Sequence, residues 1–167
     1  PALVAEFGGA ETGSRAAYVQ AVGRRVAAYS GVANSAGAYQ FTTLNSAVEN
    51  AFAVPGGYIY ITRQLMGLMN DEAELAFVLG HETGHVAARH AQARKSAATR
   101  NSILGVLGVL LGSALGNNAF GSLISQGAQQ YSRLATLSFS RGQEYQADTL
   151  SMRYLMSAGY DPLGAAT

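Results

Sequence analysis

The sequence predicts an α+β fold in which a small three-stranded sheet packs against one central helix and other helices surround both. Three observations lead to this prediction. The chain has 167 residues, 49% of them hydrophobic, which is enough to bury one sizeable core. Short β-rich segments are confined to residues 39–62. Apolar residues at helical spacing lie before and after these segments, so strands and helices occupy separate parts of the chain.

The β-rich part contains three predicted strands. Residues 39–44 alternate between apolar and polar side chains, residues 51–54 form a short extended run, and residues 58–62 are rich in tyrosine and isoleucine. The sequence Pro-Gly-Gly at residues 55–57 is typical of a tight turn, and the sheet is expected to contain an antiparallel element. Residues 11–30 carry an apolar stripe that predicts a first helix, which we expect to cover the central one.

Composition excludes several classes of protein. The net charge is +1 and no basic run occurs, so nucleic acid is not an expected partner. The absence of cysteine excludes a disulfide framework and a metal site built on thiolates. These data leave the cellular compartment and the oligomeric state open.

Residues 81–85, His-Glu-Thr-Gly-His, carry the main chemical signal. On a helix, His81 and His85 lie about 40° apart on one face and one turn apart, so both imidazoles can bind one zinc ion. Glu82 then points beside the ion, where it can act as general base toward a zinc-activated water. The alternative is a chance pattern on an amphipathic helix, which the presence of only three histidines in the chain disfavours.

The surrounding residues support a helix at this motif. Asp71 followed by Glu74 is a typical start signal, and a strongly apolar run follows. Gly84 lowers helix propensity by about 1 kcal/mol relative to alanine, which indicates that another part of the chain packs closely there. The helix is expected to continue beyond the motif through Arg89 and His90 toward residue 100.

A catalytic zinc site needs a third protein ligand. His90 would lie about 140° around a continuous helix from His85, so it cannot bind the same ion. Without cysteine, a carboxylate is expected, and the downstream candidates are Glu144, Asp148 and Asp161. Glu144 and Asp148 share one face of a helix predicted over residues 132–156, so we assign Glu144 to zinc and Asp148 to orienting a ligand imidazole, that of His81. The alternative is an exposed acidic pair on a solvated helix.

The motif H-E-T-G-H-V-A-A-R-H, followed later by S-R-G-Q-E-Y-Q-A-D, resembles the gluzincin metallopeptidases of the CAAX prenyl endopeptidase type 1, HtpX and BepA-like family. The resemblance implies a zincin-like (minigluzincin) fold and zinc endopeptidase activity. It also implies one zinc ion per chain, held by His81, His85 and Glu144, with Glu82 as general base. Protein or peptide substrates and a bacterial cell envelope location, periplasmic or peripherally membrane-associated, follow from the same resemblance.

The segment preceding the zinc helix also resembles this family, in which an edge strand holds the substrate backbone. By resemblance, Asn50, Ala51, Phe52 and Ala53 are candidate substrate-binding residues. The alternative is an ordinary strand without substrate contact. The sequence does not identify the residue that stabilises the oxyanion, for which Tyr145, Tyr160 and Arg141 remain candidates.

We expect residues 1–167 to form a single metallopeptidase domain that is cut at both ends from a longer protein. Residues 101–127 are predicted to be an apolar helical insertion within it. Its least polar part, residues 103–116, is shorter than the roughly 20 residues that span a bilayer as a helix. Two interpretations stay open: a buried core helix, and a helical hairpin that shields the cleft or contacts a membrane surface through residues 103–124.

The leading functional hypothesis is a zinc-dependent endopeptidase in envelope protein quality control. One alternative is an envelope assembly factor or chaperone with latent protease activity, for which the apolar insertion would matter more than Glu82. Another is a structural zinc module. Structural zinc sites usually have four protein ligands, however, and this sequence offers three at suitable spacing.

Overall fold

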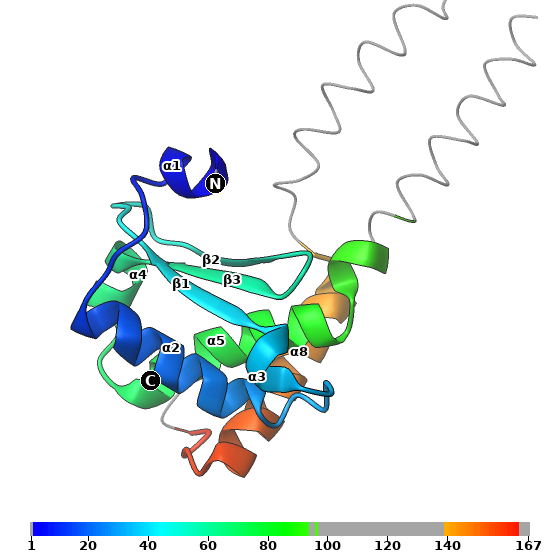
Figure 1. Ribbon diagram of the computed structural model, residues 1–167. Helices are drawn as coiled ribbons and strands as arrows, with labels where there is room; N and C mark the ends of the chain where they lie inside the picture. The colour runs from blue at the N-terminus through cyan, green and yellow to red at the C-terminus, as the bar shows by residue number, and fades with distance from the viewer. Residues whose placement is uncertain (1, 94–95, 97–138, 164–167) are drawn as a thin grey trace, which may run out of the picture. The chain divides into compact units, whose positions relative to one another are not determined.

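The structure of the protein is a computed structural model that describes residues 2–93, 96 and 139–163 (Figure 1). The chain divides into two compact units, residues 1–91 with 141–167, and residues 92–140. The second unit lies almost entirely outside the described residues, as do the predicted insertion and its membrane-contact segment. None of the helices in the described part of the chain has the length and apolarity that crossing a membrane requires.

The sheet confirms the predicted three strands. They are β1 (Gln40–Leu44), β2 (Ala51–Val54) and β3 (Tyr58–Thr62), in the order β1-β3-β2. β2 and β3 form an antiparallel hairpin, and β1 runs parallel to β3 on its other side. The hairpin turn needs glycine, because Gly57 has a φ of 83° and any Cβ there would collide with the carbonyl oxygen of Ala38.

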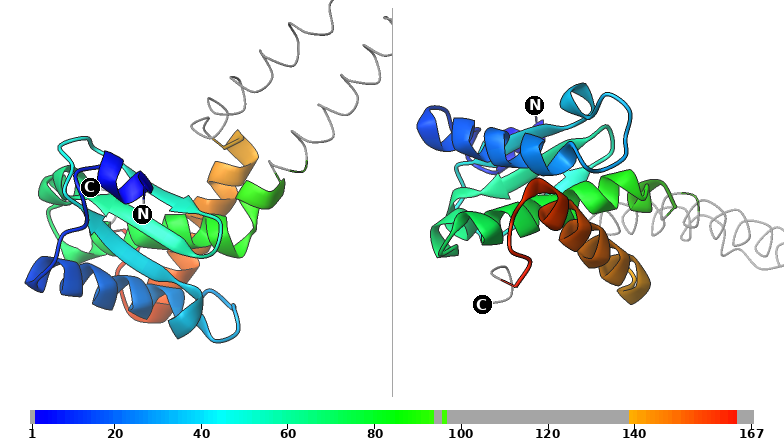
Figure 2. Two further views of the ribbon diagram at one scale, coloured as in Figure 1. Left: turned by 45° about the horizontal axis from the view of Figure 1, so that its top comes forward. Right: turned by 90° about the horizontal axis from the view of Figure 1, so that it is seen from below.

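Helices cover one face of this sheet in two layers (Figure 2). The helices of the described residues are α1 (Ala2–Glu6), α2 (Ser14–Ala27), α3 (Ser35–Ala38), α4 (Arg63–Leu68), α5 (Glu72–Ala87) and α8 (Arg141–Ala158). α2 and α5 lie against the strands, and α8 packs across both of them. The buried core lies between these layers and includes Val19, Val22, Val26, Phe41, Ile59, Ile61, Leu75, Leu79 and Leu155. The predicted α+β fold is therefore confirmed, including a first helix that packs on the central one.

The N-terminal segment covers the other face of the sheet and one of its edges. Phe7 packs on Phe52, which stacks on Tyr60, with ring centroids 5.3 and 5.2 Å apart. Farther along, the backbone N–H of Glu11 donates to the carbonyl of Thr43 on β1 at 2.8 Å. The N-terminal segment thus pairs with the edge of the sheet at β1, whereas β2 forms the opposite edge.

Helix α5 begins where the sequence predicted. The carboxylate of Asp71 accepts a hydrogen bond from the backbone N–H of Glu74 at 3.0 Å, which caps the helix. Glu74 in turn accepts hydrogen bonds from the backbone N–H and the side-chain amide of Asn70, at 2.7 and 3.0 Å. These bonds fix the entry of the chain into the helix that carries the two histidines.

The prediction that α5 runs without a break through Arg89 and His90 is wrong, and residues 97–100, toward which it was expected to extend, lie outside the described residues. The helix ends at Ala87, and the following N–H, that of Ala88, donates to the carbonyl of Gly84. Arg89 then has a φ of 55°, a left-handed conformation that is uncommon for a residue other than glycine. Helical geometry resumes at His90 in a new direction. Local propensity favoured a continuous helix, so contacts made by the rest of the fold must stabilise the break.

A close approach of α5 and α8 sets the distance between the two predicted metal-binding motifs. A Cβ atom added at Gly84 would lie 3.2 Å from the carbonyl oxygen of Ala147 and 3.3 Å from its Cα. At Gly80, one turn earlier, a Cβ would lie 2.5 Å from the hydroxyl of Ser151. That hydroxyl donates to the carbonyl of Phe77 at 2.7 Å. The close packing predicted at Gly84 is therefore present.

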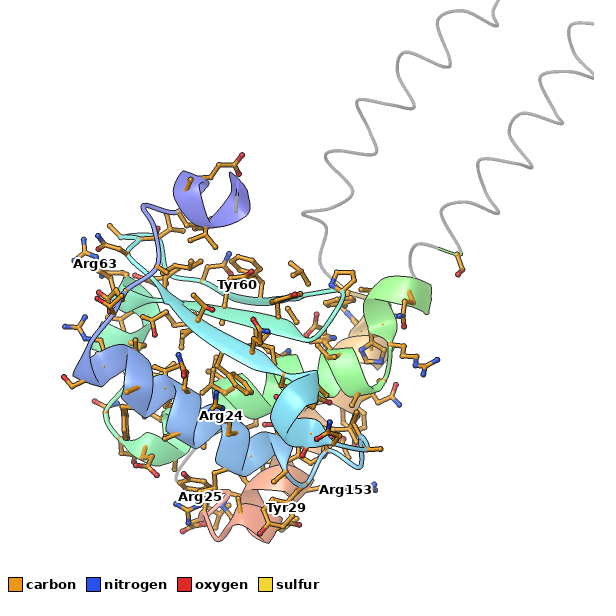
Figure 3. All side chains as sticks on the ribbon, viewed as in Figure 1. Arg24, Arg25, Tyr29, Tyr60, Arg63 and Arg153 are labelled. Carbon is orange, nitrogen blue, oxygen red and sulfur yellow. The ribbon has the colours of Figure 1, made fainter. Side chains whose placement is uncertain are left out.

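A polar cluster joins α2, the start of α5 and the end of α8, and Figure 3 labels its member Arg25 on α2. Tyr160 and Tyr18 donate to the carboxylate of Glu72 at 2.6 and 2.8 Å, and these bonds hold the pKa of Glu72 below its ordinary value. Arg25 donates to the carbonyl of Ala158 at 2.9 Å and stacks over the ring of Tyr160. Tyr160 therefore points to the start of α5, about 13 Å along the helix from the histidines, rather than toward an oxyanion.

Substituting Gly84→Ala tests the close approach of the helices. The added methyl group meets backbone atoms that cannot rotate away, so we expect a loss of about 1 to 3 kcal/mol in unfolding free energy. Denaturant unfolding of the metal-free protein measures it. Gly67→Ala on α4 is the matched control, because nothing lies within 4 Å of its added Cβ, and it should gain up to about 1 kcal/mol. Equal stabilisation by both changes would contradict the packing described.

Candidate metal centre

Two helices bring three metal-binding side chains together. α5 presents His81 and His85 on one face, and α8 brings Glu144 to them from far along the chain. The Oε2 atom of Glu144 lies 3.1 Å from Nε2 of His81 and 3.5 Å from Nε2 of His85. The two Nε2 atoms are 3.0 Å apart.

These spacings fit a tetrahedral zinc ion. Ligand atoms at zinc bond lengths of about 2.0 to 2.2 Å stand about 3.4 Å from one another in a tetrahedron, and the three separations in the structure lie close to this value. Among the described residues, this is the one cluster of histidine and carboxylate ligands that could hold a metal. Three protein ligands leave a fourth position for water or substrate, which is typical of catalytic rather than structural zinc.

Asp148 contacts the outer nitrogen of His81. Its Oδ1 atom lies 2.8 Å from Nδ1 of His81, and Asp148 stands one helical turn beyond Glu144. An ionised carboxylate only accepts hydrogen bonds, so Nδ1 of His81 donates and its Nε2 lone pair faces Glu144. The structure therefore brings Asp148 to the imidazole that the sequence analysis paired with it.

A second chain of contacts reaches the outer nitrogen of His85. Nδ1 of His85 lies 2.9 Å from Nδ1 of His90, and Nε2 of His90 lies 2.9 Å from Oε1 of Gln146 on α8. The rings of His85 and His90 are 3% and 4% exposed. Sequence reasoning excluded His90 as a ligand but did not foresee this contact, because it placed His90 on a continuous helix.

Glu82 is buried beside the two histidines, with 8% of its surface exposed. Burial raises the pKa of Glu82 from 4.5 to about 7, with Glu144 adding to the increase. The neighbouring His81 and a hydrogen bond from the backbone N–H of Ala53 act in the opposite direction and lower the pKa. A carboxyl group with a pKa near neutrality is suited both to accept and to return a proton.

The predicted substrate-binding strand lies beside Glu82. The N–H of Thr62 donates to the carbonyl of Asn50 at 3.0 Å, so every second residue from Asn50 onward pairs with β3. The backbone groups of Ala51 and Ala53 therefore face the outer edge of the sheet, and the N–H of Ala53 reaches Glu82. The side chain of Phe52 points to the face of the sheet that is turned away from α2 and α5, where it stacks on Tyr60.

Two histidines on one helix, a glutamate from a second helix and a buried glutamate between the histidines reproduce the H-E-x-x-H arrangement that is typical of zinc metallopeptidases. The chain belongs to peptidase family M48, whose family model matches residues 13–167.

Named relatives agree with this assignment. The chain is 33% identical over 129 residues to the mitochondrial metalloendopeptidase OMA1 of Arabidopsis thaliana, covering 77% of this chain and 24% of the relative. It is 31% identical over 151 residues to the beta-barrel assembly-enhancing protease of Yersinia pestis, covering 87% and 30%. It is 37% identical over 119 residues to the metalloprotease LoiP of Escherichia coli (strain K12), covering 71% and 45%. The chain thus spans less than half the length of each of these relatives.

The raised pKa of Glu82 predicts a pH-dependent cost in stability. The folded metal-free protein favours protonated Glu82, so its stability falls as the pH rises from 4.5 to about 7 and stays low above that range. Glu82→Gln removes this ionisation and keeps an acceptor for the N–H of Ala53. We expect the variant to be more stable than the wild type at pH 8, by up to about 3 kcal/mol.

Denaturant unfolding of the metal-free proteins at several pH values measures this difference. The two unfolding curves should converge toward pH 4.5, which makes the acidic measurement an internal control. A wild type as stable as the variant at pH 8 would show that Glu82 ionises in the fold without penalty.

Proposed function

We propose that this chain is a zinc-dependent endopeptidase that hydrolyses peptide bonds with a zinc-activated water and with Glu82 as general base. The observation that carries the proposal is the convergence of three ligand atoms within 3.5 Å of one another beside a buried carboxyl group. His81, His85 and Glu144 would hold one zinc ion. When bound, zinc would lower the pKa of the attacking water and polarise the scissile carbonyl.

The other residues of the site have separable tasks in this proposal. Glu82 accepts a proton from the attacking water and later donates it to the leaving amine, for which its raised pKa is suited. Asp148 orients His81 through the bond to Nδ1, so that Nε2 stays available as a ligand. Burial of Glu82 and His85 keeps bulk water from the proton being transferred.

β2 is the proposed binding strand for the substrate. It lies at an edge of the sheet, and the outward backbone groups of Ala51, together with the carbonyl of Ala53, can pair with an extended peptide. Glu82 contacts the N–H of Ala53. A peptide added to β2 would therefore pass directly over the general base, which supports protein or peptide substrates.

Envelope protein quality control is the proposed setting, supported by relatives named beta-barrel assembly-enhancing protease. We infer a bacterial cell envelope location, periplasmic or peripherally membrane-associated. The same name favours one other function, that of an assembly factor or chaperone with latent protease activity. The variant Glu82→Gln in cells separates the two. Loss of all cellular function supports the protease, and retained function supports the assembly factor.

Zinc content measured together with casein cleavage tests the proposed site. The wild type should hold about one zinc ion per chain and cleave casein. Glu82→Gln should keep zinc but lose activity by about 10²- to 10⁴-fold, because it removes the general base. Glu144→Ala should lose both zinc and activity, because it removes a ligand.

Asp161→Ala is the matched control, since Asp161 is an exposed carboxylate outside the cluster. It should keep zinc and activity. Full zinc affinity in Glu144→Ala would remove Glu144 from the ligand set. A wild type that binds zinc but never cleaves would favour the latent assembly factor.

The proposed role of β2 predicts different effects of proline at two adjacent positions. Ala51→Pro removes an N–H that faces the outer edge, so the fold should persist while kcat/KM for peptides falls about tenfold. Phe52→Pro removes an N–H that pairs with β3 and should destabilise the protein. Peptide cleavage kinetics and thermal unfolding measure the two effects. Unchanged kcat/KM in folded Ala51→Pro would exclude strand addition at this edge.

A further inference from the structure

The pair His90 and Gln146 lies outside the three metal-binding residues yet is connected to one of them. His90 is almost fully buried and contacts His85 at 2.9 Å, and Gln146 contacts His90 at 2.9 Å from α8. Both contacts use ring nitrogens rather than apolar carbon atoms. The pair therefore acts on His85 through directed hydrogen bonds.

The direction of these hydrogen bonds follows from the acceptor at the end of the chain. Oε1 of Gln146 accepts, so Nε2 of His90 carries a proton and donates it. Nδ1 of a neutral His90 is then an acceptor, and Nδ1 of His85 must donate to it. In this tautomer Nε2 of His85 carries no proton, and it is the atom that faces Glu144 and His81.

The backbone adopts an uncommon conformation to make this contact. Arg89 is a non-glycine residue with a φ of 55°, which costs on the order of 1 kcal/mol or more. This single residue turns the chain after α5 and directs His90 back to His85, which a continuous helix would place about 140° apart. The folded chain therefore has an unfavourable backbone conformation at Arg89, the residue that brings His90 into contact with His85.

We propose that His90, held by Gln146, is a positioning residue that fixes the ring orientation and the metal-binding tautomer of His85. The inference rests on the proposed zinc site. It gives His85 an orienting partner as Asp148 does for His81, but through a buried histidine held by a surface glutamine instead of an exposed carboxylate. Partners of this kind typically change metal affinity by 10- to 100-fold.

The test measures zinc dissociation constants by competition with a chromogenic chelator, alongside thermal unfolding of each metal-free protein. His90→Leu should raise the zinc Kd by about 10- to 100-fold. His90→Asn should recover much of this loss, because its side-chain oxygen can accept from Nδ1 of His85. A purely structural role would give equal losses for both variants.

Substitutions at Gln146 keep the test independent of core packing, because this residue lies on the surface of α8. Gln146→Met retains the side-chain length but removes the acceptor, so it should weaken zinc binding severalfold while the Tm of the metal-free protein stays unchanged. Gln146→Glu preserves an acceptor and should stay within about twofold of the wild type. Gln20→Met on α2 is the matched control at an exposed glutamine and should have no effect.

The possible outcomes separate the two proposals. A wild type that binds no zinc overturns the proposed function and this inference together. A wild type that binds zinc, with folded His90→Leu and Gln146→Met of unchanged affinity, overturns the positioning role alone. Weakened binding in both variants, with recovery in His90→Asn and Gln146→Glu, supports it.

Discussion

The close contact between α5 and α8 is the constraint on which the rest of the site depends. The two histidines and Glu144 come from different helices, and their ligand atoms must stand about 3.4 Å apart to share one zinc ion. Gly84 on α5 faces the backbone of Ala147 on α8, and Gly80 leaves room for the side chain of Ser151, so the two helices approach closely at both positions. Leu155, one turn after Ser151 on α8, extends this helix contact into the buried core. Core packing and ligand geometry are therefore set by one interface.

Burial at this interface has opposite consequences for different groups. It disfavours the charged form of Glu82, so the metal-free fold carries an energetic cost at neutral pH. The same burial strengthens the hydrogen bond between His85 and His90, because little water competes for it. Functional sites commonly hold groups that lower the stability of the fold, and here the apolar layers of α2, α5 and the sheet compensate.

The sequence predicted the parts of the site that depend on local geometry. Four-residue spacing placed the histidines on one face, the cap at Asp71 located the start of the helix, and the scarcity of other ligands pointed to Glu144. It failed at Arg89, because the alanines before that residue favour a helix and no glycine or proline marks the break. The contact between His85 and His90 accompanies that conformation, and it exists only in the folded chain.

Strand order was likewise not predictable from periodicity, which shows which face of a strand is buried but not which strand lies beside it. The burial of the strands agrees with the observed strand order, although their composition did not suffice to predict that order. β3 has four consecutive buried residues, Ile59 to Thr62, as expected of a central strand, whereas all four residues of β2 are only partly buried and this strand lies at the edge.

The two orienting partners of the histidines differ in charge, and the difference bears on Glu82. Asp148 is exposed, so water screens its negative charge. A carboxylate in place of His90 could also orient His85, but its charge would be buried near Glu82 and Glu144. Like charges disfavour ionisation, so the pKa of Glu82 would rise further and less of its carboxylate, the proposed general base, would be available at neutral pH. A neutral histidine orients the ligand without this penalty, and Gln146 provides the acceptor that sets its tautomer.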